Sequence, residues 1–127
     1  MQKQIKQVLE FHNGFELEYN TSPIAAISEK HKLLRFNLMK EENNEYFEAI
    51  QNNDIIEIAD ALGDMLYILC GTILAHGLQD KMEAVFDEIH RSNMSKLDTN
   101  GKPIYRDDGK VLKGIDYFKP NIEGILK

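Results

Sequence analysis

The sequence has little cysteine and a shortage of positive charge, and each shortage excludes a class of protein. Cys70 is the single cysteine among 127 residues, so no disulfide can form within the chain. A reducing cytoplasm is therefore the expected compartment. The 15 lysines and arginines stand against 21 acids, which gives a net charge of -6. This balance argues against a nucleic-acid binder that relies on a basic face, and it suits a protein that binds cations.

The sequence also has few long apolar runs. Its first twelve residues, M-Q-K-Q-I-K-Q-V-L-E-F-H, contain no signal-peptide core. The most apolar stretch, residues 65–75, is interrupted by glycine and is shorter than a bilayer requires. We therefore expect no membrane partner and a single domain over 1–127, which is long enough to bury a core.

Helical periodicity and capping residues divide most of the chain into four predicted helices. They are expected at about 2–13, 28–51, 55–76 and, starting at 78 or 80, up to 93. The connections between the last three are short, which makes neighbouring helices antiparallel and predicts an all-α four-helix bundle over about 2–96. The tail, 97–127, has a hairpin signal at Asp108-Gly109 and is expected to pack on the bundle.

Acidic side chains follow one face of each of the two central predicted helices. They are Glu41, Glu42, Glu45 and Glu48 on the first helix, and Glu57, Asp60 and Asp64 on the second. Residues three, four or seven apart share a helix face. The second helix is apolar nearly all round from its middle onward, so its acidic stripe is expected to face protein rather than water.

Carboxylates packed together must either take up protons or bind cations. No run of lysine or arginine lies on these faces, and an unpaired buried charge costs several kcal/mol. Divalent cations with oxygen ligands are the natural answer, and Mg²⁺ is the commonest. Asp60 and Asp64 have the strongest claim, because a short acid within an apolar helix has poor helix propensity and loses hydration. A Mg²⁺ held by few carboxylates keeps positions for phosphate oxygens and water.

Simpler explanations apply to some of these acids. Glu57 follows Asp54 by three residues and completes a capping box, a role that does not exclude ligation. Glu48 is favoured as a solvated surface charge. A di-iron carboxylate bundle is the rival metal site, but it needs two E-x-x-H motifs and the chain offers one related stretch, Asp87 to His90.

Two acidic segments carry a family resemblance. E-E-N-N-E (41–45), followed by E-I-A-D-A-L-G-D-M-L-Y (57–67), resembles the all-α nucleoside triphosphate pyrophosphohydrolases. That superfamily includes MazG-like proteins, phosphoribosyl-ATP pyrophosphohydrolase and the dimeric dUTPases, and its signature is E-x-x-E on one helix and E-x-x-D on the next. Glu42 to Glu45 matches the first half and Glu57 to Asp60 the second. A second register ends instead at Asp64 and places Ala61 where the family has Glu.

Downstream segments extend the resemblance to roughly residues 7–122. E-I-H-R-S-N-M-S-K (88–96) and G-K-P-I-Y-R-D-D-G-K-V-L-K-G (101–114) look like a MazG-like branch close to the phosphoribosyl-ATP pyrophosphohydrolase-like proteins. The resemblance implies a cytoplasmic helical bundle that forms a homodimer or a dimer of dimers. It also implies Mg²⁺-dependent cleavage of a (deoxy)nucleotide between the α and β phosphates, for nucleotide-pool housecleaning, with Mn²⁺ as a substitute ion.

The resemblance also assigns roles to individual residues. The metal ligands would be Glu42, Glu45, Glu57, Asp60 and Asp64. Glu41 or Glu45 would orient or deprotonate the attacking water, and Arg35, Arg91, Asn93 and Lys96 would bind the nucleotide. The alternative is a non-catalytic helical dimer that binds a metal or a nucleotide.

Overall fold

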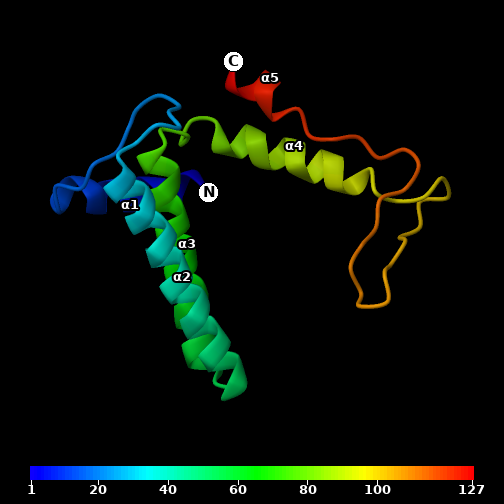
Figure 1. Cartoon of the computed structure of the whole chain (residues 1–127), viewed down its shortest axis with the longest axis horizontal. Coiled ribbons are helices and arrows are strands. Elements are labelled where there is room, and N and C mark those ends of the chain that lie inside the picture. Colours follow the sequence, from blue (N-terminus) through cyan, green and yellow to red (C-terminus); the bar gives the residue numbers. More distant parts are fainter. The chain divides into compact units, whose positions relative to one another are not determined.

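The structure is a computed structural model that describes residues 1–127 (Figure 1). Its regular elements are α1 (Gln2–Gly14), α2 (Glu29–Gln51), α3 (Ile55–Ala75), α4 (Met82–Met94) and α5 (Ile122–Leu126). The predicted all-α class is confirmed, and the predicted bounds of α1, α2 and α3 are correct to within one residue. The short α5 has no counterpart among the predicted helices. The chain forms two compact units, Met1–Asp80 and Lys81–Lys127.

In the first unit, α1 and α2 both pack against α3. Helices α2 and α3 run side by side over most of their length (Figure 1). The buried side chains of this unit are Ile5, Val8 and His12 of α1, Ala49 of α2, and Ala61, Cys70, Ile73, Leu74 and Ala75 of α3. Most of the core therefore lies along the C-terminal half of α3, where small and aliphatic side chains pack against the neighbouring helices.

A tight turn reverses the chain between α2 and α3. Asn53 takes a left-handed conformation with φ of 52°, which asparagine tolerates better than most residues. The Asp54 side chain caps α3 by accepting hydrogen bonds from the backbone N–H groups of Ile56 and Glu57. The Asp54 N–H donates to the Ala49 carbonyl and not to the Glu57 carboxylate. Only half of the predicted capping box is present, so Glu57 keeps its carboxylate for another role.

The loop between α1 and α2 is fastened to the C-terminal end of α3. The Asn20 backbone N–H donates to the Leu74 carbonyl, and its side-chain Nδ2 donates to the Ala75 carbonyl at 2.7 Å. Gly77 follows α3 with φ of 65°, and a Cβ there would lie 2.0 Å from the Ser22 carbonyl oxygen. Only glycine satisfies both conditions. These contacts hold the loop between α1 and α2 against the end of α3.

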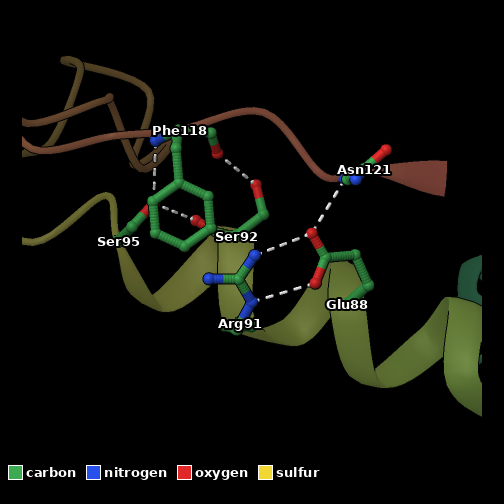
Figure 2. A network of polar contacts seen from close by, with 6 residues as sticks. All are labelled: Glu88, Arg91, Ser92, Ser95, Phe118 and Asn121. Carbon is green, nitrogen blue, oxygen red and sulfur yellow. Dashed lines mark hydrogen bonds and ion pairs between the residues drawn. The ribbon is translucent and has the colours of Figure 1, made fainter. Parts of the chain in front are cut away.

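In the second unit, the tail packs on α4 through a polar network (Figure 2). The Ser92 hydroxyl donates to the Phe118 carbonyl at 2.8 Å, and the Phe118 N–H donates to the Ser95 hydroxyl at 3.2 Å. One turn earlier on α4, the Glu88 carboxylate accepts the Asn121 N–H at 2.8 Å. These three hydrogen bonds attach the tail to α4.

The predicted hairpin is also present in the tail. Tyr105 and Val111 form an antiparallel bridge, and the Arg106 N–H donates to the Lys110 carbonyl at 2.8 Å. Gly109 has φ of 88°, the left-handed conformation for which the Asp-Gly signal selects.

Large apolar side chains remain exposed on α2 and α3. They are Leu33, Leu34, Phe36 and Phe47 of α2, and Ile55, Ile56, Leu62, Leu66, Tyr67 and Leu69 of α3. Helix α3 is 21 residues long with a mean hydropathy of 1.6, so length and composition alone would let it cross a membrane. The core helix of a soluble protein meets the same two conditions. Within one chain, much of the apolar surface of α3 is exposed.

Candidate metal centre

Three carboxylates meet between α2 and α3. One oxygen from each of Glu42, Glu45 and Asp64 lies within 4.8 Å of the other two. Glu42 and Glu45 are three residues apart and share one face of α2. Glu42 precedes the last residue of α2 by nine positions, and Asp64 follows the first residue of α3 by nine. The tight turn therefore brings the two acids to the same level of an antiparallel helix pair.

Glu42 is the least hydrated member of this acid cluster. Its side chain is half-buried, whereas Glu45 and Asp64 are exposed, and its Oε2 is buried without a hydrogen-bond partner. Burial, the adjacent Glu45 carboxylate and the charges of Asp64 and Asp60 together raise the pKa of Glu42 to about 7. The cluster holds negative charge that no group of the chain neutralises, and a divalent cation with oxygen ligands fits this donor set.

The sequence predicted that Asp60 and Asp64 lose hydration, but the structure shows this loss at a different acid. Both aspartates are exposed, even though Asp64 lies against the acids of α2. The acid that loses hydration is Glu42 on the facing helix. The crowding of carboxylates that the sequence indicated is present, but desolvation acts on a different member.

The two remaining predicted ligands lie beside the cluster. Asp60 and Glu57 line a cavity of about 440 Å³, together with Glu45, Glu48, Ala49, Asn52 and Ala61. Glu45 belongs both to the acid cluster and to the lining of this cavity, so the cavity borders the cluster. Glu41 is exposed and belongs to neither group. The structure thus brings Glu42, Glu45 and Asp64 together, and it places Asp60 and Glu57 alongside them.

Arg35, a predicted nucleotide-binding residue, lies two turns before Glu42 on α2. Its Nε donates to the Thr72 hydroxyl at 3.2 Å, and its Nη2 donates to the Ile68 carbonyl at 3.1 Å. The guanidinium is half-buried and forms no ion pair. Next to it lies His12, which is only 2% exposed. This neighbour could not be predicted from the sequence, because His12 follows the apolar spacing of α1.

The other three predicted nucleotide-binding residues lie in the second unit. Arg91 donates from Nε and Nη2 to the two oxygens of Glu88, each at 2.9 Å, and its guanidinium lies 4.3 Å from the centre of the Phe118 ring (Figure 2). Asn93 and Lys96 line a cavity of about 400 Å³ with tail residues that include Pro103 and Val111. Arg91 therefore has structural partners, whereas Asn93 and Lys96 border open space.

Comparison with known proteins agrees with this site. The family model for phosphoribosyl-ATP pyrophosphohydrolase matches residues 8–93, which include the whole acid cluster. The chain is also 33% identical over 67 residues to uncharacterized protein L479 of Acanthamoeba polyphaga mimivirus. That match covers 53% of this chain and 27% of the viral protein, so the chain spans about a quarter of this relative.

The family match covers more than half of the chain, and the helical fold and the acid cluster agree with it. The members of this family are nucleotide pyrophosphohydrolases that typically depend on a divalent metal. The chain belongs to the phosphoribosyl-ATP pyrophosphohydrolase family, within the MazG-like all-α nucleoside triphosphate pyrophosphohydrolases.

Proposed function

We propose that the chain is a Mg²⁺-dependent nucleoside triphosphate pyrophosphohydrolase. It cleaves a (deoxy)nucleotide between the α and β phosphates and releases a monophosphate and pyrophosphate, as part of nucleotide-pool housecleaning in the cytoplasm. The observation that carries this proposal is the acid cluster with its buried, unpartnered Glu42 oxygen. A bound cation would stabilise this site, because carboxylates this close together repel one another when all of them are ionised.

The ligands we propose are Glu42, Glu45 and Asp64, with Asp60 and Glu57 on the side of the neighbouring cavity. Mn²⁺ would substitute for Mg²⁺, since both accept oxygen ligands. A bound divalent ion supplies charge neutralisation for phosphate oxygens and favours deprotonation of water. The protein groups must then hold the phosphates and the water in line, which is most of what phosphoryl chemistry requires.

Two glutamates are candidates for the base that orients or deprotonates the attacking water. Glu45 is exposed and lies at the border between the acid cluster and the adjacent cavity, where water has access. Glu41 is exposed on the same helix, one residue before Glu42. The position of Glu45 favours it, because a base must lie within hydrogen-bond reach of the water that it activates.

Cationic and polar residues complete the proposed nucleotide site. Arg35 offers an unpaired guanidinium on the helix that carries Glu42, and an arginine fork suits phosphate or carbonyl oxygens. Arg91, Asn93 and Lys96 remain proposed nucleotide-binding residues on the strength of the family resemblance.

We also propose that the chain forms a homodimer or a dimer of dimers. The exposed apolar side chains of α2 and α3 support this, because soluble monomers rarely leave large contiguous apolar patches uncovered. A second copy of the chain, burying these faces against its own, is the partner that the family resemblance implies.

The decisive test is pyrophosphate release from a panel of nucleoside triphosphates, with and without Mg²⁺. We expect turnover only with the divalent ion, and we expect Asp64→Asn to lose activity and metal affinity in parallel. Glu10→Gln, at an exposed acid of α1, serves as the control. Metal or nucleotide binding without turnover on any member of the panel would instead favour the non-catalytic binding dimer.

A further inference from the structure

Two asparagines of the chain are followed directly by glycine, and this dipeptide is chemically labile. They are Asn13, near the end of α1, and Asn100, in the loop after α4. The backbone nitrogen of the next residue attacks the side-chain carboxamide carbon, which is one reason why asparagine is thermolabile. Glycine permits this attack most readily, because it has no Cβ to obstruct the approach. Asp108 also precedes a glycine and is open to the same attack.

The geometry of α1 protects Asn13. Asn13 and Gly14 are the last two residues of the helix. A helical side chain points outward and back toward the N-terminus, so the Asn13 carboxamide points away from the Gly14 nitrogen. The end of the helix is also held in place, because the Leu17 N–H donates to the His12 carbonyl at 2.8 Å and His12 is buried. Reaction at Asn13 therefore requires the last turn of α1 to unwind.

Asp108 is protected in a different way, because its carboxylate is already engaged. Arg106 donates to both of its oxygens, and the Lys110 N–H donates to Oδ1 at 3.1 Å. The Arg106 contact first, and then the Lys110 one, lower the pKa of Asp108, which keeps the side chain ionised. A carboxylate anion is a poor target for a nucleophile, so Asp108 must leave Arg106 and take up a proton before it reacts.

Asn100 has neither protection. It lies in an exposed turn, and its side chain forms no hydrogen bond within the chain. A Cβ on Gly101 would have no atom within 4 Å, so there is open space around the two reacting groups. The Gly101 N–H donates to the Asp98 carbonyl at 3.0 Å, but the Gly109 N–H is likewise used, on the Arg106 carbonyl at 2.9 Å. This bond therefore does not separate the two sites of the tail.

The loop that holds Asn100 closes on one side chain. Asp98 Oδ1 accepts the N–H of Asn100 at 2.9 Å and that of Lys102 at 2.8 Å. The Asp98 N–H in turn donates to the Lys102 carbonyl at 2.7 Å. An extra main-chain bond between Asn100 and Gly101 would move the Lys102 N–H out of register with Asp98. Pro103, the next residue, lines the cavity at the end of α4, so the closed loop holds one wall of that cavity.

We propose that Asn100 is a site of spontaneous modification that opens this loop as the protein ages. The Gly101 nitrogen forms a bond to the Asn100 carboxamide carbon, and the carboxamide nitrogen takes up the displaced proton and leaves as ammonia. Water then opens the resulting succinimide ring at either carbonyl carbon. One product is aspartate. The other is isoaspartate, in which the main chain runs through the former side chain and gains a methylene. The reaction needs only water, and it is independent of the proposed function.

The first experiment incubates the full chain at mildly alkaline pH and follows both asparagine–glycine dipeptides by peptide mass spectrometry. Conversion replaces an amide nitrogen by oxygen, and the change in peptide mass reports it. We expect conversion at Asn100 to be at least about 10-fold faster than at Asn13, because such rates depend steeply on the orientation of the reacting atoms. The same incubation in urea removes the fold, and the two rates should then be similar. Equal rates in the folded chain, or conversion at Asn100 only in urea, would refute the proposal.

Two matched variants assign the conversion to its residue. Asn100→Gln keeps the carboxamide but would have to close a larger ring, so the folded chain should stay unconverted in the tail. Asn13→Gln removes the other dipeptide and should leave the tail reaction at its wild-type rate. Isoaspartate that still formed in the tail of Asn100→Gln would place the reaction at Asp108 and would overturn the assignment to Asn100.

The second experiment measures hydrogen exchange of the Lys102 amide before and after ageing. We expect exchange to be several-fold faster in the aged wild type, because the longer main chain withdraws this N–H from Asp98, and unchanged in aged Asn100→Gln. Asn100→Asp carries the charge of one product without the extra methylene, so it should exchange like the fresh wild type. An unchanged exchange rate in chains that contain isoaspartate at this position would refute the opening of the loop.

Discussion

Two glutamates in the two units show how differently the molecule treats charge. Glu88 of α4 gives both carboxylate oxygens to Arg91 and accepts the Asn121 N–H, and these bonds hold its pKa below the usual range (Figure 2). Glu42 of α2 has a buried oxygen with no partner and three acids nearby, which raise its pKa to about 7. Charge that is already paired serves the fold, whereas charge left unpaired marks a place for a ligand.

Two arginines repeat this contrast. Arg91 is paired with Glu88 and lies over the Phe118 ring, so it helps to hold the tail on α4. Arg35 is half-buried and tethered only by neutral groups, so its charge has no counterpart within the chain. Both are predicted nucleotide-binding residues, but the charge of Arg91 is already paired with Glu88, whereas that of Arg35 is not paired within the chain.

The largest expected effect comes from removing the unpaired charge. Glu42→Gln keeps the size of the side chain and removes one anion from the acid cluster. We expect kcat/KM for triphosphate cleavage to fall about 100-fold or more, because the charge stabilisation that depends on a bound metal amounts to several kcal/mol. A Mg²⁺ titration followed by thermal melting should show a rise in Tm for the wild type and a much smaller rise for the variant.

Glu10→Gln is the matched control for this variant. Glu10 is exposed on α1 and forms no ion pair, so activity and Mg²⁺ response should stay at wild-type values. If Glu42→Gln retained wild-type activity, the acid cluster would be a crowded surface rather than a catalytic centre.

The helices of the first unit could be predicted because their signals are local. Asp54 caps α3 as its sequence position indicates, and Gly77 ends the same helix with a positive φ. The meeting of Glu42 with Asp64 also follows from spacing, since the Asn52-Asn53 turn sets the register of the two helices. The five residues of α5 are too few to show a helical period, so this helix could not be predicted in the same way.

The distribution of burial could not be predicted, because it depends on which helix covers which face. Apolar neighbours in the sequence suggested burial for Asp60 and Asp64, but both stay exposed although they lie beside the acids of α2. The pairing of His12 with Arg35 joins residues from two helices across Gly71 of a third. Only the packed structure reveals such a contact, since each residue alone has an ordinary place in its own periodic pattern.

A smaller effect is expected from the region with paired polar groups, the hydrogen-bond network between α4 and the tail. Ser92 is 1% exposed, and its hydroxyl donates to the Phe118 carbonyl. Ser92→Ala leaves that carbonyl without its donor, which should lower the free energy of unfolding by about 1–3 kcal/mol. Urea denaturation measures this, with Ser22→Ala as the control at an exposed serine whose hydroxyl forms no hydrogen bond. Equal stability of the two variants would show that the network in Figure 2 contributes little to the fold.

The Mg²⁺ response should separate the same two regions. Ser92→Ala lowers the starting Tm but should leave the Mg²⁺-induced rise unchanged, because the serine lies outside the acid cluster. A loss of the Mg²⁺ response in this variant would mean that the α4–tail network contributes to the metal site.

The smallest expected effect is the pH dependence of the metal-free chain. The pKa of Glu42 rises from 4.5 in the unfolded chain to about 7 in the folded one, so the folded state binds more protons between these values. The contribution of Glu42 to stability is therefore full below about pH 4.5 and is lost as the pH rises through about 7. The effect is modest, because Glu42 is only half-buried and solvent screens its neighbours.

Thermal melts in a chelator, from pH 5 to pH 8, test this direction. The difference in Tm between Glu42→Gln and the wild type should grow as the pH rises, while the opposite shift of Glu88 and the titration of His12 are common to both chains and cancel. Mg²⁺ should reverse the trend for the wild type, since the ion binds the deprotonated carboxylate and so competes with the proton. Parallel pH profiles for the two chains would remove Glu42 from its central place in the acid cluster.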